Sequence, residues 1–155
     1  MSAAAVEEPF EQMTLLESAE LISKQLPGHR VEIIGSEITV TPTPDMSHDR
    51  SVRRFDRAFN RAGLDGGETE VWQNIGIWLP DGPFDYAQPD LAITDADCDD
   101  RVLDYGAYDP AIFRLVLEVT SAALCSDLTR KSAANAMAGV PPTWSSTGSA
   151  GGCWC

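Results

Sequence analysis

Apolar and polar positions follow two different periods along this chain. Apolar residues recur at helical spacing from Leu15 to Leu26, which predicts an amphipathic helix. Thr14 with Glu17 three residues later is typical of a capping box at its start, and Gly28 stops it. Residues 1–12 are small, acidic and aperiodic, and we expect a loose N-terminus there.

Alternating and continuous apolar runs predict the strands. Residues 30–41 read as a hairpin with Gly35-Ser36 as its turn. Residues 70–79 and 91–93 have strand composition, and residues 112–119 form the most continuous apolar run. Such a run indicates a buried strand.

Helical spacing returns twice more. Ser47 is expected to cap a helix that runs to about residue 62, with Val52, Phe55 and Phe59 on one face. A last helix is predicted from Ser126 to about residue 138. The resulting order of helix, hairpin, helix, three strands and helix is typical of a single mixed α/β domain.

The composition limits the functional classes to which this protein can belong. The chain has 155 residues with a formal net charge of -13, which argues against non-specific coating of nucleic acid but leaves room for a nuclease whose metal ions neutralise its acids. No apolar run approaches membrane-spanning length and no secretory signal is evident, so a cytoplasmic location without membrane contact is expected. The four cysteines lack metal-ligand spacing and are read as reduced thiols.

Two acids stand at the ends of short apolar strands. Asp90 follows Pro89 and leads into residues 91–93, and Glu118 lies near the end of the run 112–119. Acids seldom occupy buried strands unless they are paired or bind a metal. If the two strands are neighbours, their carboxylates offer the hard oxygen ligands that a divalent metal needs for phosphodiester hydrolysis.

Plainer interpretations stay open. A Pro-Asp step is often a turn. Glu118 is alternatively a buried acid paired with Arg114 or Arg130. Asp127 and Lys131, one helical turn apart in the last helix, are alternatively a surface ion pair.

Six short segments occur in a characteristic order. They are residues 31–35, Ser47-His48, Pro89-Asp90, 117–121, 127–131 and 138–141. In this order and spacing, roughly over residues 13–141, the chain resembles the Uma-type putative restriction endonuclease family, a branch of the PD-(D/E)xK nuclease superfamily. The resemblance implies a restriction-endonuclease-like mixed β-sheet flanked by helices, with an N-terminal helix and a β-hairpin.

The resemblance also implies a site. Asp90 and Glu118 become ligands of Mg²⁺ or Mn²⁺, with the Val119 carbonyl as a third ligand. The lysine that usually follows the second acid is absent, because Thr120 holds that position, and the family pattern takes it from the next helix, here Lys131. The implied substrate is DNA, and a homodimer is an open alternative because superfamily nucleases are often dimers.

Other residues have supporting roles under the same resemblance. Glu32 is expected to face the site, although a half-exposed strand acid is an equal alternative. His48 is expected in a supporting or water-contacting role, or else simply at the start of a helix, and Asp127 is expected beside Lys131. Asn135 departs from the family, which often has a tyrosine there. The arginine stripe of Arg50, Arg54, Arg57 and Arg61 is interpreted either as phosphate contacts or as a solvated helix face.

The tail departs from the family pattern. Residues 142–155 are rich in glycine and serine where the family has a last core strand, and this composition favours a flexible tail. If the codons from Pro142 onward end in G or C, a shifted reading frame would encode a strand, a turn and a second strand, so we hypothesise a frame-shifted, truncated product. Two functions follow: a metal-dependent DNA endonuclease, or an inactive remnant or binding module of the same fold.

Overall fold

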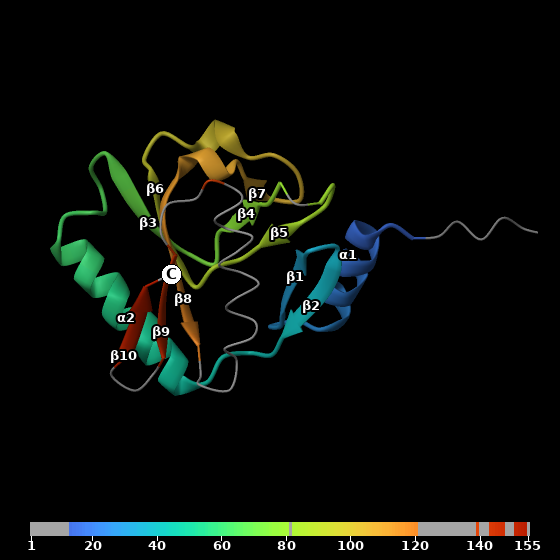
Figure 1. Cartoon of the computed structure of the whole chain (residues 1–155), viewed down its shortest axis with the longest axis horizontal. Helices are drawn as coiled ribbons and strands as arrows, with labels where there is room; N and C mark the ends of the chain where they lie inside the picture. The colour runs from blue at the N-terminus through green and yellow to red at the C-terminus, as the bar shows by residue number, and fades with distance from the viewer. Residues whose placement is uncertain (1–12, 81, 121–138, 140–142, 148–150, 155) are drawn as a thin grey trace, which may run out of the picture.

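The structure is a computed structural model that describes residues 13–80, 82–120, 139, 143–147 and 151–154 (Figure 1). Its helices are α1 (Leu15–Gln25) and α2 (Met46–Arg61), with short 3-10 turns at Asp99–Arg101 and Pro110–Ile112. Its strands are β1 (Arg30–Ile34), β2 (Glu37–Thr41), β3 (Thr69–Gln73), β4 (Gly76–Trp78), β5 (Tyr86–Ala87), β6 (Leu91–Asp95), β7 (Ala107–Tyr108), β8 (Phe113–Thr120), β9 (Thr143–Thr147) and β10 (Gly151–Trp154). The expected mixed α/β fold is confirmed.

The strands form two five-stranded sheets instead of one. The first has the order β2-β1-β5-β4-β7, and the second has the order β10-β9-β8-β6-β3. The second sheet is mixed, since β6 lies antiparallel to both β3 and β8 whereas β8 and β9 run parallel. The two sheets and the two described helices stack as layers.

Three apolar clusters hold these layers together. Ala19 of α1 packs with Val31 and Ile33 on the outer face of the first sheet. Ile34 faces the other way and packs with Val116 and other residues between the two sheets. Because successive strand residues point to opposite faces, each central strand contributes to two clusters.

The outer face of the second sheet is covered by α2. Val52 of the helix packs with Leu91 and Leu117, and Phe55 and Phe59 border this cluster. The helical spacing of these apolar residues, read from the sequence, therefore identified the buried face of α2. The packing brings the N-terminal end of α2 near the start of β6, which places the site described below.

Local signals read from the sequence are largely confirmed. Thr14 and Glu17 form the capping box of α1. The β1–β2 turn is formed by Gly35 and Ser36, with φ of 61° and 59°, which is the geometry that two-residue hairpins favour. One cap was wrong: the N-cap of α2 is Asp45, whose carboxylate accepts hydrogen bonds from the amides of Ser47 and His48.

The predicted strand over residues 70–79 is two strands. The chain leaves the second sheet after Gln73, bends at Asn74 with φ of 55°, and enters the first sheet at Gly76. Residues 70–79 have strand composition throughout, so composition alone did not reveal the change of sheet.

The C-terminal segment also differs from expectation. Residues 143–147, expected in a flexible tail, form β9, and residues 151–154 pair with it as β10. Parallel pairing with β8 satisfies backbone groups whatever the side chains are, so a serine- and glycine-rich segment can still complete a sheet. The helix predicted over residues 126–138 lies outside the described residues.

Candidate active site

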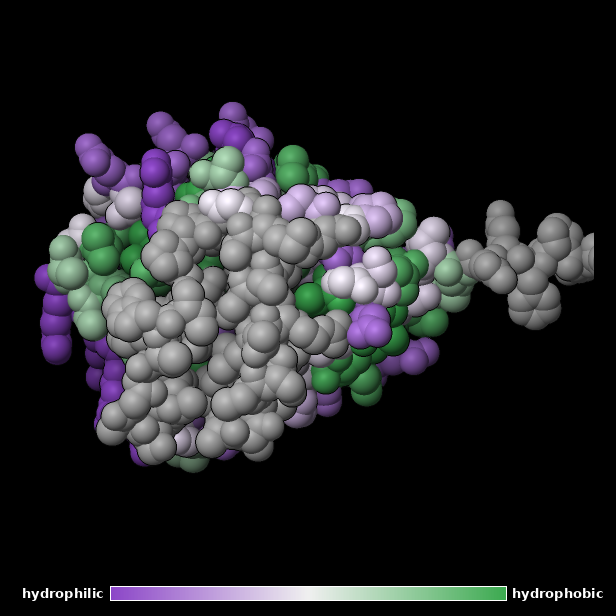
Figure 2. All heavy atoms as spheres, in the orientation of Figure 1, coloured by the Kyte–Doolittle hydropathy of each residue, from purple (hydrophilic) through white to green (hydrophobic). Residues whose placement is uncertain are grey.

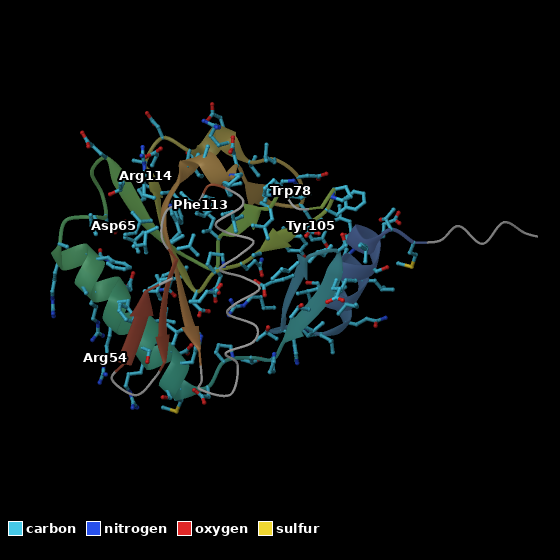
Figure 3. The ribbon with its side chains drawn as sticks, in the orientation of Figure 1. Arg54, Asp65, Trp78, Tyr105, Phe113 and Arg114 are labelled. Carbon is cyan, nitrogen blue, oxygen red and sulfur yellow. The ribbon has the colours of Figure 1, made fainter. Side chains whose placement is uncertain are left out.

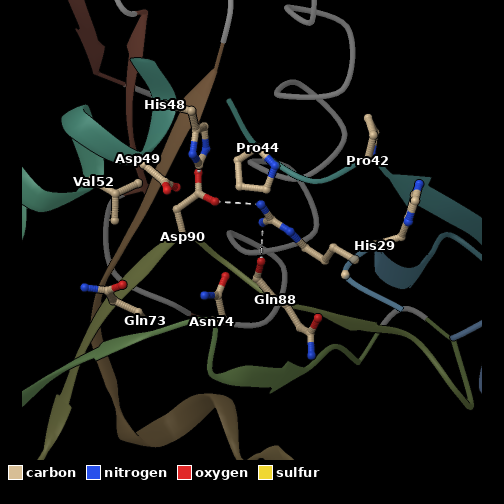
Figure 4. A pocket seen from close by; sticks show the side chains of 12 residues that line it. His29, Pro42, Pro44, His48, Asp49, Val52, Gln73, Asn74, Gln88 and Asp90 are labelled. Carbon is tan, nitrogen blue, oxygen red and sulfur yellow. Dashed lines mark hydrogen bonds and ion pairs between the residues drawn. The ribbon is translucent and has the colours of Figure 1, made fainter. Parts of the chain in front are cut away.

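Two of the points at which the chain passes from one sheet to the other lie side by side. The chain crosses after β3, through Asn74, and again after β5, through Gln88 to Asp90. A cavity of about 270 Å³ opens at these crossings. Its polar lining comes from His29, Arg30, His48, Asp49, Gln73, Asn74, Gln88 and Asp90, most of which Figure 4 labels.

Asp90 is the most heavily bonded acid at this cavity. Its Oδ1 lies 2.6 Å from a guanidinium nitrogen of Arg30. Its Oδ2 lies 3.0 Å from Nε2 of His48 and accepts a hydrogen bond of 2.8 Å from the backbone N–H of Val119. The carboxylate is 3% exposed, so its charge is held by these donors and not by bulk water.

Glu118 lies beside Asp90 because of the strand register. Leu91 of β6 is paired with Leu117 of β8 in an antiparallel ladder. The next residue outward on each strand is Asp90 on one and Glu118 on the other. Facing residues of antiparallel strands lie close together, so the condition that the two strands be neighbours is met.

Arg30 connects the acids. Besides its ion pair with Asp90, it lies 3.8 Å from Oε2 of Glu118 and donates a hydrogen bond of 2.5 Å to the backbone carbonyl of Gln88. The N–H of the same Gln88 donates to Oε1 of Glu32 at 2.8 Å. Arg30 and Glu32 lie two residues apart on β1 and therefore share a face of the strand.

Three buried carboxylates thus gather around one guanidinium. Glu32, Asp90 and Glu118 are 0%, 3% and 4% exposed. Burial disfavours the charge of Arg30 and lowers its pKa, but the three carboxylates outweigh burial, so the pKa lies above its usual value. The formal charge of the acids exceeds that of the arginine, which makes this a site of surplus negative charge.

The acid and the histidine shift each other's pKa in opposite directions. Burial raises the pKa of Asp90. The hydrogen bond from His48, the charge of Arg30 and the Val119 N–H lower this pKa by more than burial raises it, so the net shift is downward. The hydrogen bond to Asp90 raises the pKa of His48 above its usual value against the opposing effect of burial. Both shifts favour an anionic Asp90.

Some of the remaining residues predicted from the sequence lie outside the described residues, and the contacts of the others can be compared with the predictions. Asp127 and Lys131 lie outside the described residues. Val119 meets Asp90 through its backbone N–H; its carbonyl stays a predicted ligand. Arg114 is not the partner of Glu118, because it pairs with Asp95 at 2.7 Å.

Arg30 was missed in the reading of the sequence. The sequence pattern predicts Arg30 only as the first residue of a hairpin. A signal was available, since Arg30, Glu32 and Ile34 alternate on one strand face and the other face is apolar. That pattern places a charged pair on a buried strand, although it does not identify Asp90 as the partner.

The described side chains at the cavity offer the donor atoms that a divalent metal prefers, but they are not arranged as a metal site. Among the described residues, no group of three or more His, Cys, Asp or Glu side chains is arranged to hold a metal ion. The donor set at the cavity nevertheless consists of buried carboxylate oxygens with surplus negative charge, which suits Mg²⁺ or Mn²⁺. The residues present therefore fit the ion by chemistry, with Arg30 now bonded to the acid.

The arginines of α2 occupy another surface. Arg50, Arg53, Arg54, Arg57 and Arg61 are all exposed. At 100° per residue they lie opposite Val52, Phe55 and Phe59, and Figure 3 shows Arg54 on the outer side of the helix. Figure 2 shows hydrophilic side chains along the left edge of the molecule, where α2 lies. Because His48 shares the inner face with Val52, the stripe points away from the cavity, which favours the solvated-face interpretation.

No helix among the described residues is long and apolar enough to span a bilayer.

Both the sequence and the fold of this chain match known proteins. A family model described as Uma2, putative restriction endonuclease, matches residues 10–146. A crystal structure of a putative nuclease belonging to DUF820 from Anabaena variabilis superposes with a TM-score of 0.61 at 16% sequence identity, covering 86% of this chain and 73% of that chain. At that identity the superposition shows a shared fold. The search of curated proteins found no match.

The family match spans most of the chain and includes both acids, the hairpin and α2. The resemblance noted from short motifs is thereby confirmed, and its limits widen from residues 13–141 to residues 10–146. The chain belongs to the Uma2 family of putative restriction endonucleases.

Proposed function

We propose that this protein is a metal-dependent endonuclease that hydrolyses DNA, with Asp90 and Glu118 as ligands of Mg²⁺ or Mn²⁺. The observation that carries the proposal is the pair of buried carboxylates that adjacent strands bring together, with Asp90 at the wall of a polar cavity. The family description supports a nuclease, and DNA as substrate follows from that description.

The bound metal would supply a polarised phosphoryl oxygen and an activated water. The chain supplies the rest. His48 and the Val119 N–H fix the orientation of Asp90 from two directions, and such support keeps a ligand in place. Lys131, on the segment after β8, is proposed to stabilise the developing negative charge on the phosphate or to position the water, with Asp127 beside it.

Plasmid nicking tests the proposal. Supercoiled DNA is incubated with the protein and Mg²⁺ or Mn²⁺, and the wild type is compared with Asp90→Asn and Glu118→Gln. These changes keep side-chain shape and remove the negative charge. Loss of a contact that only supports a metal ligand costs about 10- to 100-fold in affinity or activity. We therefore expect the loss of a ligand itself to lower cleavage by at least about 100-fold.

Asp95→Asn is the matched control. Asp95 is the last residue of β6, the strand that Asp90 precedes, and it pairs with Arg114 at an exposed position. Cleavage by this variant should equal that of the wild type. Cleavage that survives both Asp90→Asn and Glu118→Gln would reject the proposed site.

A non-catalytic domain of the same fold is the second candidate. It is favoured by one observation, the occupation of both Asp90 oxygens by protein donors. Folded wild-type protein that cleaves no DNA with either metal would support it.

A further inference from the structure

Arg30 is bonded to an Asp90 oxygen that a metal ligand normally leaves free for the metal. Its guanidinium takes Oδ1 of Asp90 at 2.6 Å, and it is the nearest described cation to Glu118, at 3.8 Å. The arginine side chain is only 15% exposed. The other Asp90 oxygen is already shared by His48 and the Val119 N–H.

Because of these bonds, Asp90 has little capacity to bind a second cation. Mg²⁺ requires direct contact with its oxygen ligands and near-ideal octahedral geometry. Oδ1 cannot keep a short ion pair with Arg30 and offer the same lone pairs to a metal. The two cations would also repel each other at the short distance that a shared carboxylate imposes.

We propose that Arg30 and the catalytic divalent cation compete for Asp90 and Glu118, so that metal binding breaks the Arg30–Asp90 ion pair. The inference rests on the proposed function, because it takes these two acids as the metal ligands. Without the metal, the arginine neutralises part of the acid cluster and stabilises the fold. With the metal, the guanidinium has room to move, since it already lines the 270 Å³ cavity.

Calorimetric titration with Mn²⁺ tests the competition directly. Arg30→Gln removes the competing charge and keeps a polar side chain. We expect it to bind Mn²⁺ more tightly than the wild type by about tenfold or more. Arg114→Gln is the matched control, because it removes an equal charge from an exposed ion pair on β8, and its affinity should match that of the wild type.

A second measurement needs no variant. Phenylglyoxal modifies accessible arginines, and peptide mass spectrometry reports the rate at each one. Saturating Mn²⁺ should raise the modification rate of Arg30 several-fold and leave that of Arg114 unchanged. This measurement keeps the inference testable if Arg30→Gln does not fold. A rate at Arg30 that stays constant or falls with Mn²⁺ would overturn it.

The outcomes separate this inference from the proposed function. Mn²⁺ binding that is lost in the Asp90→Asn, Glu118→Gln double variant but unchanged or weakened in Arg30→Gln would overturn the competition and leave the metal site standing. Mn²⁺ binding that is absent from the wild type, or that persists in the double variant, would overturn both. Tighter binding in Arg30→Gln that also depends on the two acids supports both.

Discussion

Arg30 and Asp90 stand 60 residues apart in the chain, and their side chains meet at 2.6 Å at the wall of a polar cavity. The arginine begins the hairpin of one sheet, and the aspartate precedes a central strand of the other. This ion pair therefore ties the two sheets together next to one of the points where the chain crosses between them. The same pair joins the stability of the fold to the chemistry of the site.

Replacing Arg30 by glutamine should destabilise the protein by about 3 kcal/mol. Removing one partner of a buried ion pair leaves a desolvated charge behind, here Asp90 with Glu118 close by. Urea denaturation followed by tryptophan fluorescence measures the change. Arg114→Gln, whose side chain is 62% exposed, should cost less than about 1 kcal/mol. Equal losses in the two variants would contradict the special role of Arg30.

His48 should contribute to metal affinity without binding the metal itself. Its Nε2 fixes Oδ2 of Asp90, and loss of such a supporting contact typically lowers metal affinity about 10- to 100-fold. We expect His48→Ala to weaken Mn²⁺ binding to that extent while Ser47→Ala, on the same helical turn, leaves it unchanged. A normal affinity in His48→Ala would show that the Val119 N–H orients Asp90 alone.

Asp85 should matter for stability but not for the site. Its buried carboxylate accepts hydrogen bonds from the amides of Gly35 and Ser36 in the β1–β2 turn. Hydrogen bonds to a charged acceptor are stronger than neutral ones, so Asp85→Ala should cost about 2–4 kcal/mol. Thermal melting measures this cost. Mn²⁺ affinity at a temperature where the variant is folded should equal that of the wild type, and a change there would show that the turn influences the cavity.

The capping box of α1 should make a pH-dependent contribution to stability. The backbone N–H and the hydroxyl of Thr14 donate to Glu17, and they lower the pKa of that carboxyl from 4.5. Because the folded-state pKa is depressed, the contribution is present above about pH 4.5 and is lost as the pH falls through the folded-state pKa. The difference in unfolding free energy between wild type and Glu17→Gln should therefore shrink from pH 6 to pH 3. A difference that stays constant over this interval would contradict the assignment.

Local features of the fold could be predicted from local patterns. The capping box of Thr14 and Glu17, the turn at Gly35 and Ser36, and the buried face of α2 each depend on residues a few positions apart. Side-chain periodicity and turn chemistry report such short-range geometry reliably. The apolar strands that carry Asp90 and Glu118 were predicted for the same reason.

The partners across the fold could not be predicted in this way. Periodicity tells which face of a strand is buried but not which strand lies opposite, so the division of residues 70–79 between two sheets was missed. The pairing of residues 143–147 with β8 was missed because backbone hydrogen bonding does not depend on apolar side chains.

The sequence by itself determined the local elements and set two acids at strand ends. Only the tertiary structure decided that Glu32, Asp90 and Glu118 gather around Arg30, because these residues lie on or just before strands of different sheets. A charge on a buried strand must find a counter-charge, and the packing of the two sheets selects which one. The proposed competition between arginine and metal at this site therefore depends on the fold.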